Sequence, residues 1–502
     1  MEPVIEGLSL ILLDPFNIML IFGSVLIGVL VGALPGLSSP MAIALLLPFT
    51  ITLEPVPAVA MMAALYCAGT FGGSITAILI NAPGAPPAVA TALDGYPMAK
   101  RGEAGRALGI ATFSSVTGGV LSLIVFIVAA PALAAVALKF RPPEYFALAV
   151  FALSMLASIS GKSSLRNLIS GAFGVLLGTV GIHLTTGVER FTFGFPELTE
   201  GIAFVPVLIG LFAIGELLNQ SQALTAHYER IRAHVTKLPD RNDLRLIWKT
   251  VLRSSALGTF IGILPAEGST VAAIMGYNEA KRWSKNKEQF GTGCPEGIAG
   301  PEAANNAATG GAMVPTLALG IPGSGSTALI LVALIMHGFR PGPFLVQQTP
   351  EFIYAIFGAM LIANFMFLGI GLVGAKVFSQ VTLIPRTILW PAVVVFSMIG
   401  AYASASDLLD VWIMLIAGIA GFIMRRHGFG LAPLVMGLIL GSLVEEAFSQ
   451  SMIMYDNNFL GLFESPIVVG FFVLTFFSLF WPFAGPIVKR MVTRPGVGAK
   501  DS

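Results

Sequence analysis

Charge is scarce in this sequence. Of its 502 residues, 11% are charged and 55% are hydrophobic, and the mean hydropathy is +0.85. A typical soluble protein carries more than twice that share of charge, at roughly 25%. The composition therefore excludes an ordinary soluble domain and predicts a polytopic membrane protein. The net charge of +1 gives no reason to expect nucleic acid as a partner.

Cysteine and catalytic motifs are also scarce. The two cysteines, Cys67 and Cys294, have a spacing that supports neither a disulfide framework nor a metal site, so we expect both to be structural. The chain has no H-E-x-x-H motif and no Gly-x-Ser-Gly arrangement for a catalytic nucleophile, so we expect no enzyme. Glu2 and Glu6 stand where a signal peptide would carry Lys or Arg, so we expect the first apolar helix to insert uncleaved.

Apolar segments fill most of the chain, and we expect roughly a dozen membrane crossings of about 20 residues each. Glycine and proline interrupt four of these segments. The interruptions lie at Leu34 to Ser39, Asn81 to Pro87, Leu264 to Thr270 and Ile321 to Ser326. Backbone released at such a break is tolerated at membrane depth only inside protein or beside a water-filled cavity. The breaks therefore predict broken or re-entrant helices.

The breaks recur in order as an internal repeat. GVLVGALPGLSS (28–39) resembles GTFIGILPAEGS (258–269), and GGSITAILINAPG (72–84) resembles GGAMVPTLALGIPG (310–323). DGYP (94–97) falls where HGFRP (337–341) does. The pattern predicts an all-α fold of two related halves. We place a first repeat at 1–225, a connector at 226–250, a second repeat at 251–488 and a tail at 489–502.

Basic residues predict that the two repeats have opposite orientations. Lys100, Arg101 and Arg106 follow the second break of the first half, whereas Lys281 and Lys285 precede the second break of the second half. Because Lys and Arg accumulate on the cytoplasmic side, two non-equivalent loops are both cytoplasmic. This is an inverted-topology repeat, which is typical of secondary transporters. The connector and the C-terminal tail then also lie in the cytoplasm.

The broken helices provide the candidate site. A half-helix that begins at a Gly-Ser break directs unpaired N–H groups and a positive dipole end at an anion such as a carboxylate. Unwound carbonyls and Asn or acidic side chains can instead coordinate a small hard cation, and we expect Na⁺ as the coupling ion. The candidate substrate contacts are Ser38, Ser39, Ser269, Thr270, Ser324 and Ser326. The candidate cation contacts are Asn81, Asn305, Asn306 and Glu267.

These polar and small residues also have simpler explanations. Small residues allow helices to pack closely, and Asn305 and Asn306 could merely bridge helices by side-chain hydrogen bonds. Glu302 follows a polar loop, and a central charge costs about 2.5–3.5 kcal/mol on insertion scales, so we expect it near the membrane surface. Close packing is expected at the GxxxG pairs Gly28–Gly32, Gly174–Gly178 and Gly437–Gly441.

Taken together, the motifs resemble one family. They are LPGLSS (34–39), GGSITAILINAPG (72–84), DGYPMA (94–99), GPEAANNA (300–307), GIPGSGSTA (320–328), GAYA (400–403) and MGLILGSLVEEAF (436–448). Over almost its entire length the chain resembles the large membrane subunit of the tripartite tricarboxylate transporter family, the TctA type.

This resemblance implies a multi-pass protein of the bacterial inner membrane that imports tricarboxylates or dicarboxylates by Na⁺ symport. It also implies a periplasmic solute-binding protein that delivers substrate, a small four-helix membrane subunit and an elevator-type movement. The chain departs from the family pattern at Pro265-Ala266-Glu267, where the family usually has Pro-Gly and small residues. A negative charge there favours an acid of lower charge than citrate, or a cation held at Glu267.

An ion or anion channel is the alternative function. Channels also use broken helices and polar rings, but they are commonly assembled from identical subunits around one axis. Here the symmetry is internal and inverted, which favours a transporter. A saturable flux that depends on partner proteins would exclude the channel.

Overall fold

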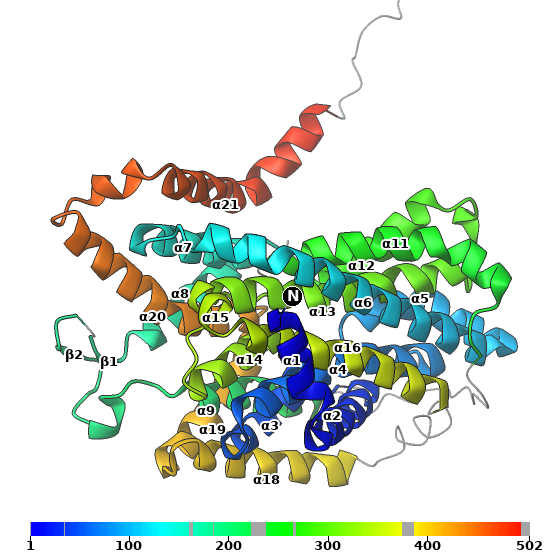
Figure 1. The fold of residues 1–502 in the computed structure, drawn as a ribbon, viewed down its shortest axis with the longest axis horizontal. Coiled ribbons are helices and arrows are strands. Elements are labelled where there is room, and N and C mark those ends of the chain that lie inside the picture. The colour runs from blue at the N-terminus through cyan, green and yellow to red at the C-terminus, as the bar shows by residue number, and fades with distance from the viewer. Residues whose placement is uncertain are drawn as a thin grey trace, which may run out of the picture. The chain divides into compact units, whose positions relative to one another are not determined.

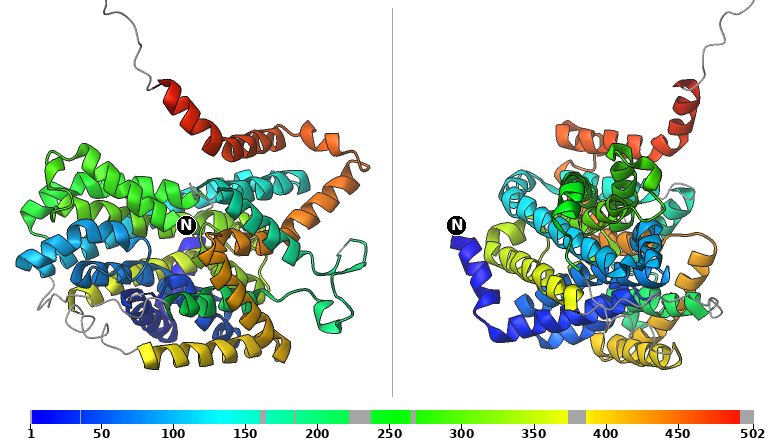
Figure 2. Two further views of the ribbon diagram at one scale, coloured as in Figure 1. Left: turned by 180° about the vertical axis from the view of Figure 1, so that it is seen from behind. Right: turned by 90° about the vertical axis from the view of Figure 1, so that its right-hand side faces the viewer.

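The computed structural model describes residues 2–34, 36–159, 164–183, 185–221, 237–264, 268–373 and 386–492, and Figures 1 and 2 show its ribbon. These residues are almost entirely helical, as the all-α prediction requires. The strands among them form one short antiparallel pair. It consists of β1 (Gly181–Ile182) and β2 (Glu189–Arg190), with Gly181 opposite Arg190.

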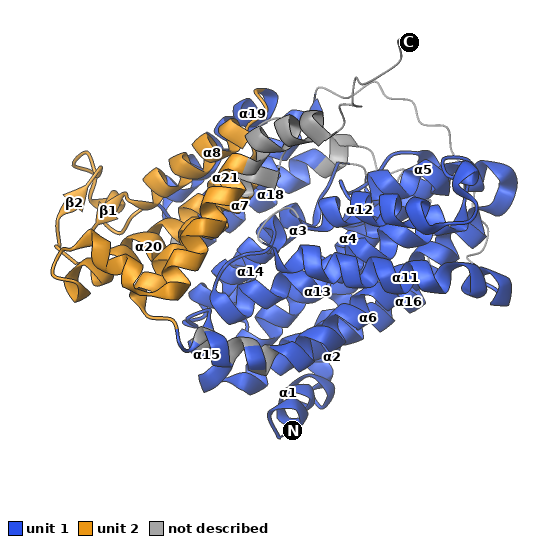
Figure 3. Cartoon of the chain, turned by 90° about the horizontal axis from the view of Figure 1, so that it is seen from above, with its two compact units in different colours: residues 1–139, 202–426 blue, residues 140–201, 427–502 orange. Residues whose placement is uncertain are grey.

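The chain divides into two compact units, coloured in Figure 3, and unit 1 comprises residues 1–139 and 202–426. Its elements before the connector are α1 (Glu2–Leu12), α2 (Pro15–Ala33), α3 (Ser39–Leu46), η1 (Leu47–Thr52), α4 (Pro55–Ile80), α5 (Ala88–Met98), η2 (Ala99–Glu103), α6 (Ala104–Ala137), α9 (Phe204–Ile209), η5 (Gly210–Ile214) and α10 (Gly215–Gln220). Those after it are α11 (Arg241–Ile263), α12 (Gly268–Trp283), η7 (Lys287–Gln289), α13 (Pro295–Leu319), α14 (Gly325–Met336), α15 (Pro343–Gln348), α16 (Pro350–Val373), α18 (Arg386–Ala405) and α19 (Leu408–Arg426).

Unit 2 comprises residues 140–201 and 427–502. Besides β1 and β2, its elements are α7 (Pro142–Ile159), α8 (Ser164–Gly178), η4 (Pro196–Leu198), α20 (Leu431–Met454), η8 (Phe459–Glu464) and α21 (Pro466–Val492). Within it α20 packs on α7 and α8, and α21 packs on α7. Each unit therefore contains chain from both predicted halves.

All four predicted helix breaks are present. They separate α2 from α3, α4 from α5, α11 from α12 and α13 from α14. Asn81 and Gly320 end α4 and α13 in the left-handed conformation, with φ of 52° and 72°. Because this conformation stops an α-helix, the ends of these two helices are fixed by the local sequence.

The helices α4 and α13 form the centre of unit 1, and nearly all of their residues are buried. They hold equivalent positions, because α2 packs along α4 as α11 packs along α13. A Cβ added to Gly72 would lie 2.6 Å from the carbonyl oxygen of Val29, and one added to Gly311 would lie 2.5 Å from that of Thr259. The same close helix contact is therefore built from glycine in both halves.

Helices are exchanged between the halves. The first-half helix α6 packs on α13, and the second-half helix α16 packs on α4. Similarly, the segment from α9 to α10 packs on α18 and α19, whereas α20 packs on α7 and α8 within unit 2. Each of these contacts has a counterpart with the roles of the halves reversed.

The expected GxxxG packing is confirmed. A Cβ on Gly28 would lie 2.9 Å from the carbonyl oxygen of Leu65, and in unit 2 one on Gly178 would lie 3.0 Å from that of Leu438. A Cβ on Gly437 would overlap the carbonyl oxygen of Gly171. These glycines therefore act in helix packing.

Six helices of the described residues are long and apolar enough to cross a membrane. They span Pro15–Ala33, Pro55–Ile80, Ala88–Ala129, Pro350–Val373, Leu408–Arg426 and Leu431–Met454. Shorter apolar helices include α14 and the stretch of α3 and η1, which flank breaks. The chain is thus a multi-pass membrane protein, and the figure of roughly a dozen crossings stays a prediction.

Candidate functional site

Two half-helix N-termini meet in unit 1. The helix α3 begins after the first break and α14 after the last, and the two are in contact. A Cβ added to Gly325 would lie 3.7 Å from the Pro40 ring. Ser38 and Ser324 cap these helices, each accepting a backbone N–H of its own first turn, at 3.4 and 3.2 Å. The structure therefore brings Ser38 and Ser324, from opposite halves, to a place where two positive helix ends converge.

The central helix α4 supports this site. The Ser324 hydroxyl donates to the Tyr66 hydroxyl at 3.2 Å, and Tyr66 is buried in α4. The Ser324 N–H donates to Thr327 Oγ1 at 2.9 Å, which completes a reciprocal capping box. Ser39 and Ser326 are buried beside the two caps. Four of the six candidate substrate contacts thus belong to one region.

The other two candidate contacts, Ser269 and Thr270, belong to a different break. They lie in the first turn of α12, where both residues are partly buried. The helix α12 contacts α5, α11 and α13. Residues 265–267 are not described, so Glu267 lies outside the described residues.

Asn81 lies at the end of α4 and is exposed. Its N–H donates to the Thr76 carbonyl at the helix terminus. Its left-handed backbone matches that of Gly320 at the end of α13. Asn81 is therefore the C-cap of α4.

Glu302 is fully buried in α13. Its carboxylate accepts hydrogen bonds from the hydroxyls of Thr91 in α5 and Ser115 in α6, the latter at 2.7 Å. The expectation that Glu302 lies near the membrane surface stays a prediction, but its burial inside the protein was not foreseen from the sequence. The physical reason is that α13 is enclosed by α4, α5, α6, α11 and α12, which the preceding polar loop did not reveal.

Asn305 and Asn306 are also buried in α13. The Asn306 amide donates to the Glu302 carbonyl oxygen at 3.3 Å. Asn306 Oδ1 and both polar atoms of the Asn305 side chain have no hydrogen-bond partner among the described residues. A buried polar group without a partner costs about 1–3 kcal/mol. These amides are therefore available to a bound ligand.

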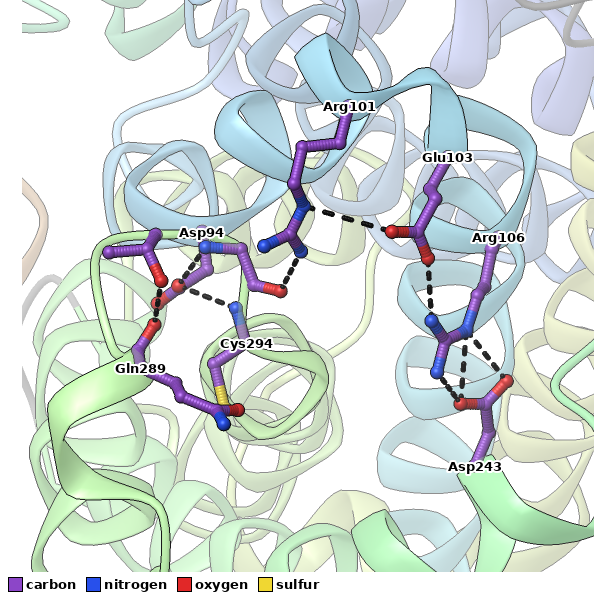
Figure 4. A network of polar contacts seen from close by, with 9 residues as sticks. Asp94, Arg101, Glu103, Arg106, Asp243, Gln289 and Cys294 are labelled. Atoms are coloured by element: carbon purple, nitrogen blue, oxygen red, sulfur yellow. Dashed lines mark hydrogen bonds and ion pairs between the residues drawn. The ribbon is translucent and has the colours of Figure 1, made fainter.

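A second polar network lies around Asp94 in α5 (Figure 4). Asp94 Oδ1 accepts backbone N–H groups of Gly291, Gly293 and Cys294 at 2.9, 2.8 and 2.8 Å. Its Oδ2 accepts the Tyr277 hydroxyl at 2.9 Å. Sequence reasoning used DGYP only to mark the repeat, and it missed Asp94 as a link between the halves. The sequence did offer one sign of a role for Asp94 beyond the repeat, because the equivalent motif of the second half has His337 at this position.

Basic residues extend the same network (Figure 4). Arg101 donates to the Gly293 carbonyl at 2.6 Å. Arg106 pairs with Glu103 at 2.5 Å and with Asp243 in the first turn of α11. The basic loop of the first half, the loop before α13 and the start of α11 therefore meet at one end of unit 1.

Comparison with known proteins agrees with the motifs. Residues 18–436 match the model of the Tripartite tricarboxylate transporter TctA family. The chain is 41% identical over 470 residues to an Agrobacterium vitis protein described as "Uncharacterized 52.8 kDa protein in TAR-I ttuC' 3'region", covering 93% of this chain and 94% of that one. It is 36% identical over 210 residues to the "Uncharacterized protein in TAR-II ttuC' 3'region" of the same organism, covering 42% and 87%. No solved structure matches. The chain therefore belongs to the tripartite tricarboxylate transporter TctA family and is a transporter component, not an enzyme.

Proposed function

We propose that this chain imports carboxylate anions of the tricarboxylate or dicarboxylate class by secondary active transport coupled to Na⁺. The observation that carries the proposal is the meeting of the N-termini of α3 and α14 beside Ser38 and Ser324. Two positive helix ends and serine hydroxyls suit a carboxylate group. Ser39 and Ser326 are the neighbouring hydroxyls of this anion site.

Inverted repeats and an elevator-type movement belong to the same proposal. The exchange of equivalent helices supports a twofold relation between the halves. The contact of Arg101 with Gly293 supports the assignment of both basic loops to one side of the membrane, although they are not equivalent in the repeat.

Two partner proteins and a membrane complete the proposal. Members of the family work with a periplasmic binding protein and a small membrane subunit. We assign this chain a periplasmic solute-binding protein that delivers the acid, a small four-helix subunit and a place in the bacterial inner membrane.

The negative charge of the substrate is the reason to propose coupling to Na⁺. Moving one negative charge inward against about 100 mV costs roughly 2.3 kcal/mol. Co-transported cations make the net charge that moves inward positive, so that the membrane potential favours uptake. Asn305 and Asn306 are the proposed cation contacts, because their buried amides include atoms without partners.

The test is uptake of radiolabelled carboxylates into proteoliposomes with both partners present. Replacing Ser324 with Ala should raise the half-saturating substrate concentration about tenfold, the worth of one hydrogen bond to a charged group, and leave the Na⁺ dependence unchanged. Ser324→Thr is the control, because it keeps a hydroxyl cap. Uptake that is unchanged when choline replaces Na⁺ at clamped pH would refute the coupling. If Ser324→Ala also behaves like the wild type, the anion site lies elsewhere, and Thr270 is the next residue to change.

A further inference from the structure

The carboxyl group of Glu302 lies in an environment that does not balance its charge. The donors that reach it are neutral hydroxyls, among them those of Thr91 and Ser115. Its side chain has no exposed surface. An uncompensated carboxylate in such a place is costly, so a cation or a proton must accompany it.

Amide oxygens without partners flank this carboxyl group. Asn305 and Asn306 follow Glu302 by three and four residues, the spacings that place helical side chains next to one another. Asn305 Oδ1 and Asn306 Oδ1 are buried and have no hydrogen-bond partner among the described residues. One turn of α13 therefore presents a carboxylate and two amide oxygens with free lone pairs.

The relation between the halves indicates where Asn305 faces. Tyr66 precedes the helix end at Asn81 by as many residues as Asn305 precedes the helix end at Gly320. The Tyr66 hydroxyl reaches Ser324 at the start of α14. In the other half, α5 corresponds to α14 and Asn305 corresponds to Tyr66. By this correspondence Asn305 should face the start of α5, where Thr91 contacts Glu302.

The same alignment shows that the cluster exists in one half alone. Ala63 and Cys67 of α4 stand at the positions equivalent to Glu302 and Asn306. Tyr66 stands at the position of Asn305. The carboxylate and both amides are therefore features of α13 that its partner helix does not share, and they mark a single site.

We propose that Glu302, Asn305 and Asn306, with the hydroxyl oxygens of Thr91 and Ser115, bind one Na⁺ ion. The inference rests on the proposed Na⁺-coupled transport and names the site of the ion. Hard cations take carboxylate, amide and hydroxyl oxygens as ligands. One carboxylate makes a neutral site with a monovalent ion, whereas Ca²⁺ would leave a net positive charge in the protein interior.

The experiment measures Na⁺ binding directly. The full-length chain is purified in detergent, and its thermal unfolding is followed while Na⁺ replaces choline at constant ionic strength. The wild type should be stabilised by Na⁺. Glu302→Gln should raise the half-saturating Na⁺ concentration at least about tenfold, because the charge that balances the ion is lost. Asn305→Ala should raise it less, and Glu302→Asp should keep part of the response.

Glu296→Gln is the matched control. Glu296 is a second buried carboxylate of α13 that also accepts hydrogen bonds from two hydroxyls, those of Thr250 at 3.2 Å and Ser284. The residues three and four positions after it are Ala299 and Gly300, which carry no side-chain oxygen, so its neutralisation should leave the Na⁺ response unchanged. A symmetric elution profile for each variant shows that it is folded.

Uptake into proteoliposomes is measured in parallel to separate the two proposals. If wild-type uptake requires Na⁺ and folded Glu302→Gln keeps the wild-type Na⁺ response, the site is wrong and the proposed transport stands. If the wild type neither binds Na⁺ nor requires it for uptake, the coupling ion is wrong and the site falls with it.

Discussion

Arg106 Nε lies 3.1 Å from each carboxylate oxygen of Asp243, so one guanidinium faces both oxygens of one buried carboxylate. Arg106 lies in the first turn of α6, and Asp243 lies in the first turn of α11. The pair therefore fastens the first half of the chain to the helix that opens the second half.

The first prediction concerns the stability that this pair provides. Asp243→Ala should lower the free energy of unfolding by about 1–3 kcal/mol, because Arg106 loses its buried partner and α11 loses its capping box. Glu103→Gln, which removes an exposed pair, should change it by less than about 1 kcal/mol. Unfolding in detergent, followed by tryptophan fluorescence, measures both. Equal effects of the two substitutions would contradict the assignment.

The second prediction concerns the hydrogen bonds that Asp94 accepts. Asp94→Ala leaves the N–H groups of Gly291, Gly293 and Cys294 without their acceptor, so it should destabilise the protein by at least about 3 kcal/mol. Asp94→Asn keeps one carbonyl oxygen and should cost less. Limited proteolysis between α12 and α13 should accelerate in the alanine variant. If the alanine variant is cleaved there at the wild-type rate, the hydrogen bonds of Asp94 do not hold this loop in place.

The third prediction concerns topology. In a variant without Cys67 and Cys294, single cysteines at Arg101 and at Lys285 should both be protected from an impermeant maleimide in intact cells. Both should react after the membrane is permeabilised. Labelling of either site from outside would contradict the inverted arrangement.

The fourth prediction concerns the chemistry of Cys294. Burial raises the pKa of its thiol, so less thiolate is present at pH 8 than in a free cysteine of pKa about 8.5. Because the thiolate is the reactive form, alkylation of the native protein by N-ethylmaleimide should be slow at pH 7–8 and rise only at higher pH. Mass spectrometry of a Cys67→Ser variant, native and unfolded in detergent, measures the rate. Equal rates in the two states would refute the prediction.

The fifth prediction concerns helix packing in unit 2. A Cβ on Gly174 would overlap the Leu434 carbonyl oxygen, so Gly174→Ala should force α8 from α20 and cost about 1–3 kcal/mol. A Cβ on Gly470 would meet no atom within 4 Å, so Gly470→Ala should be neutral or stabilise by up to about 1 kcal/mol. Thermal unfolding of the two variants compares them. A neutral Gly174→Ala would show that the helices tolerate wider spacing.

The helix breaks could be predicted because their causes are local. Glycine, proline and asparagine carry the backbone preferences that end a helix, as Asn81 and Gly320 do. The relation between the halves was also visible, because similar motifs recur in the same order.

The burial of Glu302 and the role of Asp94 could not be predicted, because both depend on distant chain. Glu302 is enclosed by α5 and α6 of the other half. Asp94 meets Gly293, which lies 199 residues later. A hydropathy pattern indicates whether a segment can be buried, but it does not identify the distant segment that packs on it. The pairing of β1 and β2 was missed for a related reason, since four residues carry no periodicity.

The exchange of helices also sets an order of events during synthesis. The glycine face of α8, at Gly171 and Gly174, is covered by α20, which is made much later. At about 5–20 residues per second, the intervening chain takes on the order of tens of seconds to emerge. Throughout that time α8 must rest against lipid or an insertion factor. The segment from α9 to α10 waits for α18 and α19 in the same way, and because α20 is made after both, unit 2 is the last part of the protein to close.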